Sequence, residues 1–217
     1  MSSLTPSRIV AAGSDIVRQG SRPKECTLIV SGWACRYSAL ADGRRQTMAL
    51  HLAGDFVDLH SFPLKVMDHS VAAITDCTIS TVPHDTVRQF TEADPHLMRM
   101  LWMLTLVDAA ILRQWLLGSG QRSSLEHAAH LICELFTRMQ VGGLATSGRE
   151  FELPLSQQEF GDALGITSVH VSRTIAELRV RQFFNWRSGM AQILDWDGLR
   201  DLAEFDPTYL SLRDEPR

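Results

Sequence analysis

The segment SQQEFGDALGITSVHVSRTIAELR, residues 156–179, decides the fold because it predicts two short helices joined by a tight turn. Ser156 and Glu159 have the spacing of a capping box, so the first helix begins here. Gly165 suits the left-handed backbone that ends a helix before a sharp turn, and Thr167 is placed to cap the second helix. Together these signals predict a helix-turn-helix, whose second helix enters a DNA major groove.

The two predicted helices have distinct inner and outer faces. Phe160 and Leu164 place apolar groups on one face of the first helix, and Gly161 is small where the second helix must approach closely. The inner face of the second helix consists of Val171, Ile175 and Leu178. The candidate DNA-binding residues at its exposed N-terminal end are Thr167, Ser168, Val169, His170, Ser172 and Arg173.

The stretch FFNWRSGMAQIL, residues 183–194, follows the second helix and predicts a β-hairpin that turns at Ser188-Gly189. A hairpin in this place is the arrangement of a winged helix. Arg187 lies at the predicted turn and is a candidate phosphate contact, with Arg179 and Arg181 nearby. An ordinary helical hairpin inside an enzyme shares some of these signals, but their joint spacing favours DNA binding.

Composition sets broad limits on the function. The chain has 217 residues, of which 45% are hydrophobic, so a packed core is expected. A net charge of −4 excludes a general polycation but not a local basic surface. The N-terminal residues 1–15 lack a secretory pattern, and we expect a cytoplasmic protein. No nucleophile–base pair or phosphate-binding loop is recognisable, so an enzyme is not expected.

Residues 1–93 have the pattern of a β-barrel or jelly roll that forms an N-terminal sensor domain. Short apolar runs recur between turn signals, and Asp42-Gly43 is a good hairpin signal. Gly32, Gly43 and Gly54 are spaced by eleven residues, as strands and turns are in such folds. A short helix is expected over His84 to Thr91.

A long helix is predicted from Pro95 to about Leu117. Arg99, Asp108 and Arg113 interrupt it, so we do not expect it to span a membrane. Its apolar residues nearly encircle it, which predicts one face against its own barrel and one against a second copy. The alternative is a central core helix of a monomer. Asp108 interrupts the best 3-4 spacing, so a perfect coiled coil is not implied.

The long helix is expected to give way to a separate C-terminal domain. Gly118-Ser119-Gly120 is a natural hinge, and a capping box at Ser123 and Glu126 predicts a helix through about Met139. A short strand is expected from Phe151 to Pro154. The predicted domains are therefore the barrel at 1–93, a dimerisation helix and hinge at 94–120, and a winged helix-turn-helix at 121–217.

Three segments resemble the CRP/FNR family of bacterial transcription regulators, and the resemblance covers almost the whole chain. LPLSQQEFGDALGITSVHVSRTIAELR, residues 153–179, is the most specific and looks like the recognition region of alphaproteobacterial members. HLICELFTRM from His130 resembles the helix that opens their DNA-binding half, and GDFVDL from Gly54 resembles a turn of their cyclic-nucleotide-binding-like barrel.

The resemblance implies an α+β protein with an N-terminal cyclic-nucleotide-binding-like β-barrel, a long dimerisation helix and a C-terminal winged helix-turn-helix. It implies a homodimer that binds double-stranded DNA sequence-specifically at an inverted repeat, with RNA polymerase as a further partner. A second hypothesis is a small-molecule or redox-sensing or gas-sensing protein whose helix-turn-helix mediates protein contacts.

Two departures from the family concern the effector. Cyclic-AMP-binding members hold the ribose with a Gly-Glu pair, where this chain has Asp58-Leu59, and the phosphate with an Arg-Ser pair, where it has His69-Ser70. A histidine replaces a fixed guanidinium poorly, so we expect no cyclic AMP binding. Residues 1–25 lack the clustered cysteines of oxygen-sensing members, so no iron–sulfur cluster and no other cofactor is expected.

A third departure concerns the DNA sequence. Val169 stands where many members have a glutamate that accepts a hydrogen bond from cytosine, so the preferred half-site should differ. Arg173 matches the family arginine and is the first choice for a guanine contact, with Ser172 and His170 as second choices. Ser168, near the helix start, is expected to meet phosphate.

The histidines and cysteines are expected to have structural roles. His51, His60 and His69 lie in or near the barrel, and His127 and His130 could ligate a metal from one helix, but surface or capping roles are commoner and no metal site is expected. Cys26, Cys35, Cys77 and Cys133 form no C-x-x-C pair. Oxidation sensing by Cys35 or Cys133 is less favoured than burial as small hydrophobes. The sequence does not determine the effector, the DNA half-site, or whether the protein activates or represses transcription.

Overall fold

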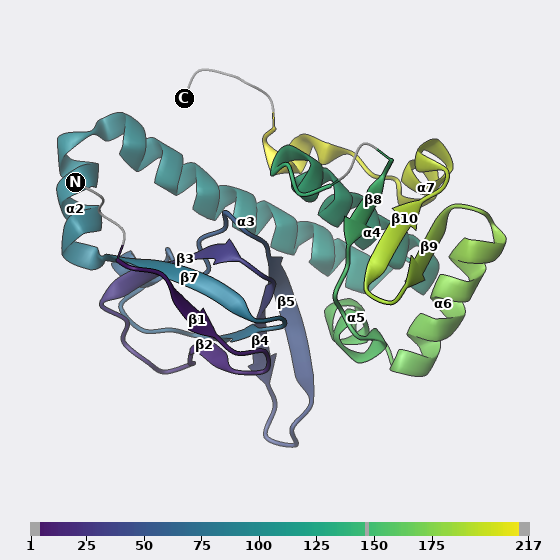
Figure 1. Cartoon of the computed structure of the whole chain (residues 1–217), viewed down its shortest axis with the longest axis horizontal. Coiled ribbons are helices and arrows are strands. Elements are labelled where there is room, and N and C mark those ends of the chain that lie inside the picture. Colours follow the sequence, from purple (N-terminus) through teal and green to yellow (C-terminus); the bar gives the residue numbers. More distant parts are fainter. Residues whose placement is uncertain (1–4, 146–147, 213–217) are drawn as a thin grey trace. The chain divides into compact units, whose positions relative to one another are not determined.

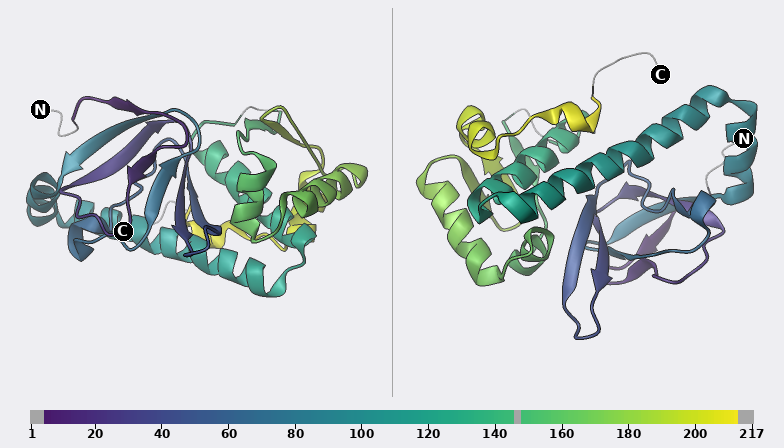
Figure 2. Two further views of the ribbon diagram at one scale, coloured as in Figure 1. Left: turned by 90° about the horizontal axis from the view of Figure 1, so that it is seen from below. Right: turned by 180° about the vertical axis from the view of Figure 1, so that it is seen from behind.

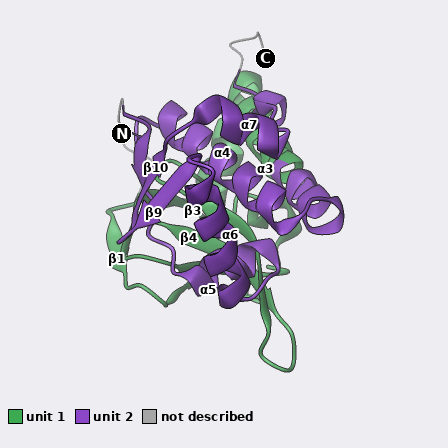
Figure 3. Ribbon diagram, turned by 90° about the vertical axis from the view of Figure 1, so that its right-hand side faces the viewer, with its two compact units in different colours: residues 1–110, 213–217 green, residues 111–212 purple. Residues whose placement is uncertain are grey.

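The computed structural model describes residues 5–145 and 148–212 of the chain. Two compact units are present, one ending at Ala110 and one extending from Ile111 to Leu212 (Figure 1, Figure 3). The boundary between them falls inside the long helix α3 (Pro95–Gln121). Each unit encloses its own set of buried apolar side chains.

The first unit is built from antiparallel strands in two sheets, with orders β1-β7-β3 and β2-β6-β4-β5. Its strands are β1 (Arg8–Val10), β2 (Asp15–Val17), β3 (Glu25–Ser31), β4 (Ala34–Ala39), β5 (Arg45–His51), β6 (Ser70–Ala73) and β7 (Cys77–Pro83). Its short helices are α1 (Ser61–Leu64) and α2 (His84–Ala93). The sequence pattern did not indicate β1 or α1, which have only three and four residues.

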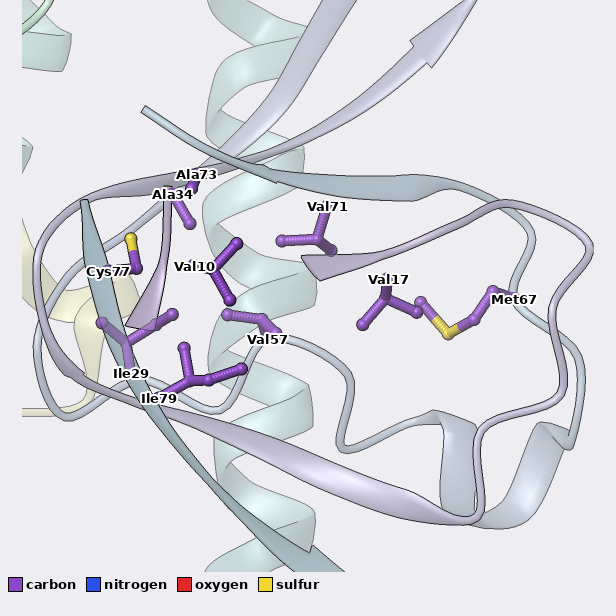
Figure 4. Close-up of a cluster of buried hydrophobic side chains, with 10 residues drawn as sticks. All are labelled: Val10, Val17, Ile29, Ala34, Val57, Met67, Val71, Ala73, Cys77 and Ile79. Atoms are coloured by element: carbon purple, nitrogen blue, oxygen red, sulfur yellow. The ribbon is translucent and has the colours of Figure 1, made fainter. Parts of the chain in front are cut away.

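The core of this unit lies between the two sheets (Figure 4). Ile29 on β3 and Ile79 on β7 are paired in one sheet, and Val71 on β6 comes from the other. All three side chains are fully buried. Burial of such side chains contributes about 1.5–3 kcal/mol each, which makes this apolar layer the main stabilising feature of the barrel.

The predicted hairpin at Asp42-Gly43 is present between β4 and β5. Gly43 has a φ of +86°, which a residue with a Cβ adopts only at a cost. The Asp42 carboxylate accepts a hydrogen bond from the Arg44 backbone N–H at 3.1 Å, as turn aspartates do. The turn residues therefore account for the register of this hairpin.

The second unit has helices around a small three-stranded sheet of order β8-β10-β9. Its elements after α3 are α4 (Ser124–Val141), β8 (Glu150–Glu152), α5 (Gln157–Leu164), α6 (Ser168–Val180), β9 (Phe184–Arg187), β10 (Met190–Ile193), α7 (Trp196–Ala203) and the 3₁₀ helix η1 (Pro207–Leu210). The capping box predicted at Ser123 and Glu126 is formed at the start of α4.

Figure 2 shows α3 as one unbroken helix. It begins where Asp94 accepts hydrogen bonds from the backbone N–H groups of His96 (2.9 Å) and Leu97 (3.2 Å). By length and composition it is the one helix of the described residues that could cross a membrane. Only 11% of its most apolar stretch is buried. Most of its apolar surface therefore has no cover within one chain.

The prediction that the long helix ends at about Leu117, before a hinge at Gly118-Ser119-Gly120, is wrong, because α3 continues to Gln121. Gly118 has a different role. A Cβ at this position would lie 2.5 Å from Nε2 of His127, whose side chain is buried on α4. Gly120, in contrast, faces open space. Gly118 is thus required for the close approach of α3 and α4.

Alanine substitutions at Gly118 and Gly120 distinguish a role of these glycines in helix packing from a role as a hinge. Gly118→Ala should lower the free energy of unfolding by about 1–3 kcal/mol, because the new methyl group collides with His127. Gly120→Ala should raise it by roughly 0.5–1 kcal/mol, because alanine favours the helix and meets nothing. Urea unfolding of both variants is the measurement. An equal decrease in the two variants would contradict the packing explanation.

Candidate nucleic-acid interface

The helix-turn-helix of the second unit is formed by local hydrogen bonds that the sequence predicted. At the start of α5, Ser156 Oγ accepts from the Glu159 backbone N–H (3.1 Å), and the Glu159 carboxylate accepts from the Ser156 backbone N–H (2.7 Å). Gly165 ends α5 in the left-handed conformation with φ +71°. Thr167 Oγ1 then caps α6 by accepting from the His170 backbone N–H (3.3 Å). The turn is therefore fixed at both ends.

The two helices of the motif are held close together by Gly161. A Cβ at Gly161 would lie 2.5 Å from the Ile166 carbonyl oxygen and 3.4 Å from Val171 Cγ2. A backbone oxygen cannot swing aside as a flexible side chain can, so only glycine fits here. The predicted inner face of α6, with Val171, Ile175 and Leu178, is buried.

The outer surface of α6 carries the residues expected to meet DNA. Val169 is 62% exposed, and His170, Ser172 and Arg173 are also exposed. Thr167 lies exposed at the N-cap, and Ser168 is half-buried in the first helical turn. Among the described residues, Arg173 has no ion-pair partner, so its guanidinium is available to a ligand.

The predicted wing is the β9–β10 hairpin, and Arg187 lies exposed at the end of β9. Ser188 and Gly189 both have positive φ, +51° and +77°, as a tight two-residue hairpin turn requires. Trp186 on β9 donates its indole N–H to the Leu153 carbonyl at 3.1 Å. This contact fixes the hairpin beside the segment that leads into α5.

The three arginines expected near the wing differ in whether their guanidinium groups already have partners among the described residues. Arg181 is paired with Glu177 at 2.5 Å, and Arg179 donates to the Asn185 side chain at 3.2 Å. Arg187 makes no ion pair within residues 5–145 and 148–212. Arg187 is therefore the wing arginine best able to meet a phosphate.

A buried polar cluster under α4 supports this surface, and sequence reasoning did not identify it. The carboxylate of Glu134 is fully buried. It accepts hydrogen bonds from the Trp115 indole N–H (3.1 Å) and the Tyr209 hydroxyl (3.0 Å), and it pairs with Arg138 (3.4 Å). A glutamate inside the apolar run of α4 was the available signal, but its partners come from distant segments of the chain.

His130 belongs to the same cluster. Its Nδ1 donates to the Ala203 carbonyl (3.3 Å), which places Nε2 at 3.2 Å from the Tyr209 hydroxyl. Burial lowers the pKa of His130 to about 4 and raises the pKa of Glu134. Nδ1 of His130 is held by the Ala203 carbonyl, and Nε2 faces the Tyr209 hydroxyl, which donates its proton to Glu134.

In the barrel, the two positions that depart from cyclic-AMP-binding members are engaged with neighbours. Asp58 is fully buried and accepts from the backbone N–H (2.5 Å) and Oγ1 (3.0 Å) of Thr27. Burial raises the pKa of Asp58 to about 6. His69 Nδ1 lies 2.7 Å from Asp68 Oδ1. His60 lies beside these two residues, and the three are candidate metal ligands.

The structure combines a barrel of two antiparallel sheets, a long helix and a winged helix-turn-helix, which is the architecture of a bacterial transcription regulator. The family model for the cyclic nucleotide-binding domain matches residues 7–94, and that for the Crp-like helix-turn-helix domain matches residues 126–202. The chain belongs to the CRP/FNR family of transcription regulators, which are not enzymes.

Individual relatives agree with this assignment. The nitrogen fixation regulation protein FixK of Rhizobium meliloti is 30% identical over 202 residues, which cover 90% of this chain and 88% of that protein. The transcriptional activator protein FnrL of Cereibacter sphaeroides is 28% identical, over 79% of this chain and 69% of that protein. The structure of FixK2 from Bradyrhizobium japonicum has the same fold, with a TM-score of 0.80 at 24% identity over 91% of this chain and 96% of that one.

The buried histidine under α4 predicts a pH-dependent stability. In the folded protein His130 binds a proton only near pH 4, whereas its ordinary pKa is 6.5. Unfolding therefore takes up a proton between these values, and the stability that neutral His130 contributes is lost as the pH falls from about 6.5 to about 4. His130→Gln should reduce this slope by up to about 1.4 kcal/mol per pH unit.

Urea unfolding at a series of pH values measures the slope. The exposed His170→Gln serves as a control that removes a histidine outside the buried cluster. The assignment fails if His130→Gln keeps the wild-type slope.

Proposed function

We propose that the protein regulates transcription as a homodimer that reads an inverted repeat, with one α6 helix in each of two successive major grooves. The observation that carries this proposal is the surface of α6, where Arg173 is exposed and lacks an ion-pair partner in the described chain. Half-sites read in this way lie about 34 Å apart on one side of the duplex. The protein would act in the cytoplasm and contact RNA polymerase there.

The residues of α6 and the wing have different proposed roles. Arg173 donates to O6 and N7 of a guanine, with Ser172 and His170 beside it. Val169 can contact only a thymine methyl group, so no cytosine is selected at its position. Thr167 and Ser168, at the helix N-terminus, and Arg187, on the wing, contact phosphates and position the helix.

The proposed dimer contact is an exposed stripe on α3. Met98, Trp102, Thr105, Ala109, Leu112 and Leu116 follow one another at alternating intervals of four and three residues. This is the spacing of a coiled-coil seam. Trp102 is 58% exposed and Leu116 is 72% exposed, which is a large apolar surface to leave in water.

Asp108 is not a member of this stripe. Its carboxylate pairs with Arg36 of β4 at 2.6 Å, so it belongs to the side of α3 that faces the barrel. This ion pair anchors the first part of α3 to the barrel. Thr105 and Ala109, at the middle of the stripe, are small and permit two helices to approach closely.

We propose that this regulator does not use cyclic AMP. The buried Asp58 already has hydrogen-bond partners on Thr27. Burial, with the charge of Arg36, lowers the pKa of His69, so its imidazole is neutral at pH 7 and cannot neutralise a cyclic phosphate. A thiol-based redox signal is also disfavoured, because burial raises the pKa of Cys26 to about 12 and that of Cys133 as well.

Arginine variants test the DNA-reading surface. Arg173→Ala should weaken binding to the preferred site by about 1–3 kcal/mol and relax the preference at one base pair. Arg187→Ala should weaken all sequences alike and reduce the slope of log K against log salt by roughly 0.9 for each phosphate that Arg187 no longer neutralises. Selection from random DNA defines the site, and gel shifts measure both variants.

Arg200→Ala is the matched control, because Arg200 is an arginine of α7 that pairs with Asp197 and Asp201. If the wild-type protein showed no sequence-selective, salt-dependent binding, the helix-turn-helix would serve protein contacts instead. Unchanged preference in Arg173→Ala would contradict the role given to that residue alone.

A charge placed in the stripe tests the dimer. Trp102→Glu should raise the dimer dissociation constant by at least about 100-fold, because burying an unpaired charge costs about 3–5 kcal/mol. Leu104→Glu, at an exposed apolar position outside the stripe, should leave it nearly unchanged. Sedimentation equilibrium measures both. A monomeric wild-type protein, or equal effects of the two variants, would refute this interface.

A further inference from the structure

We propose that His60, Asp68 and His69 form a binding site for a divalent transition-metal ion in the barrel unit. His60 directly precedes α1, and Asp68 and His69 directly precede β6. The fold brings their potential ligand atoms to within 4.8 Å of one another. The two imidazole rings have centroids 4.8 Å apart and are tilted by 42°. The site does not depend on whether the protein binds DNA.

The hydrogen bond between Asp68 and His69 prepares one of the ligands. Asp68 Oδ1 lies 2.7 Å from His69 Nδ1. A carboxylate only accepts, so Nδ1 carries the ring proton and the lone pair of the neutral ring is on Nε2. Carboxylates orient metal-binding histidines in this way in many proteins. Asp68 therefore supports His69 from behind the ring and does not itself need to bind the ion.

The Nε2 atoms of His60 and His69 point to a missing ligand. Both are buried, and neither has a hydrogen-bond partner within the described part of the chain. His69 as a whole is only 6% exposed. An unsatisfied buried polar atom destabilises the folded state. Two such atoms on adjacent rings are expensive in a folded protein unless something else binds them.

The charge around the cluster favours a cation. The nearby charged groups are the carboxylates of Asp68 and Asp108 and the guanidinium of Arg36. Two negative charges against one positive charge leave a formal charge of −1. An oxyanion would meet the same two carboxylates.

The donor set indicates which ions fit. Two imidazole ligands suit Zn²⁺, Co²⁺, Ni²⁺ or Fe²⁺, whereas Mg²⁺ and Ca²⁺ prefer sites made of oxygen ligands alone. Two protein ligands leave further coordination positions for water or another small molecule. The exposed side chain of Asp68 provides access from solvent. Spacing along the sequence did not reveal this site, since eight residues lie between the two histidines.

Metal titration of the full chain, purified without a polyhistidine tag and stripped with a chelator, tests the proposal. Visible absorption should report one Co²⁺ bound per chain, and calorimetry should show Zn²⁺ displacing it. His60→Gln and His69→Gln should abolish this binding. Asp68→Asn should weaken it by about 10- to 100-fold, as loss of an orienting carboxylate does. His96→Gln, at an exposed histidine of α3 outside the cluster, should bind as the wild type does.

Circular dichroism shows which variants fold. If a histidine variant failed to fold, the wild type and Asp68→Asn would decide, because the Asp68 side chain is exposed and its removal leaves the core intact. Zn²⁺ should raise the Tm of the wild type, because an ion that binds only the folded state stabilises it. Absence of ion binding by the wild type, or wild-type affinity in Asp68→Asn and in every folded histidine variant, would overturn the site.

Discussion

The DNA-binding unit depends on the buried carboxylate of Glu134. A carboxylate removed from water needs donors on its oxygens, and here they come from the end of α3 (Trp115), from α4 (Arg138) and from η1 (Tyr209). Removing one donor leaves a buried charge partly unsatisfied, which is far more costly than removing a surface ion pair. The end of α3, α4 and η1 are therefore held in one arrangement, and α4 also packs against α6 of the helix-turn-helix. The apolar core supplies most of the free energy, whereas this carboxylate specifies how the segments fit together.

A second ion pair, between Arg36 and Asp108, has the corresponding role in the barrel unit. It holds the part of α3 before Ile111 against the strands, while Met98, Trp102 and Ala109 stay exposed. The same pair borders the histidine cluster, where burial, and then the positive charge of Arg36, lowers the pKa of both imidazoles. The barrel unit thus has one polar corner that connects strand β4, the first part of α3 and the candidate metal ligands.

The parts of the structure that sequence predicted are those determined by neighbouring residues. Capping boxes at Ser123 and Ser156 and the left-handed Gly165 act within one turn of the chain, and all are present. The exposed face of α6 followed from its helical period. Gly118, Asp108 and Glu134 could not be interpreted in this way, because their roles depend on His127, Arg36 and Tyr209, which only the tertiary structure brings near. Gly118 illustrates the difference, since a glycine beside another glycine indicates flexibility locally but close packing once α4 is in place.

The apolar stripe on α3 also has a consequence for a newly made subunit, before it binds DNA. Its Trp102 and Leu116 side chains are exposed, and chaperones and proteases recognise such apolar surfaces. In the proposed dimer these side chains are buried, and the amount of dimer depends on the square of the subunit concentration. If the stripe is the dimer contact, scarce subunits stay exposed to proteases whereas abundant subunits are protected.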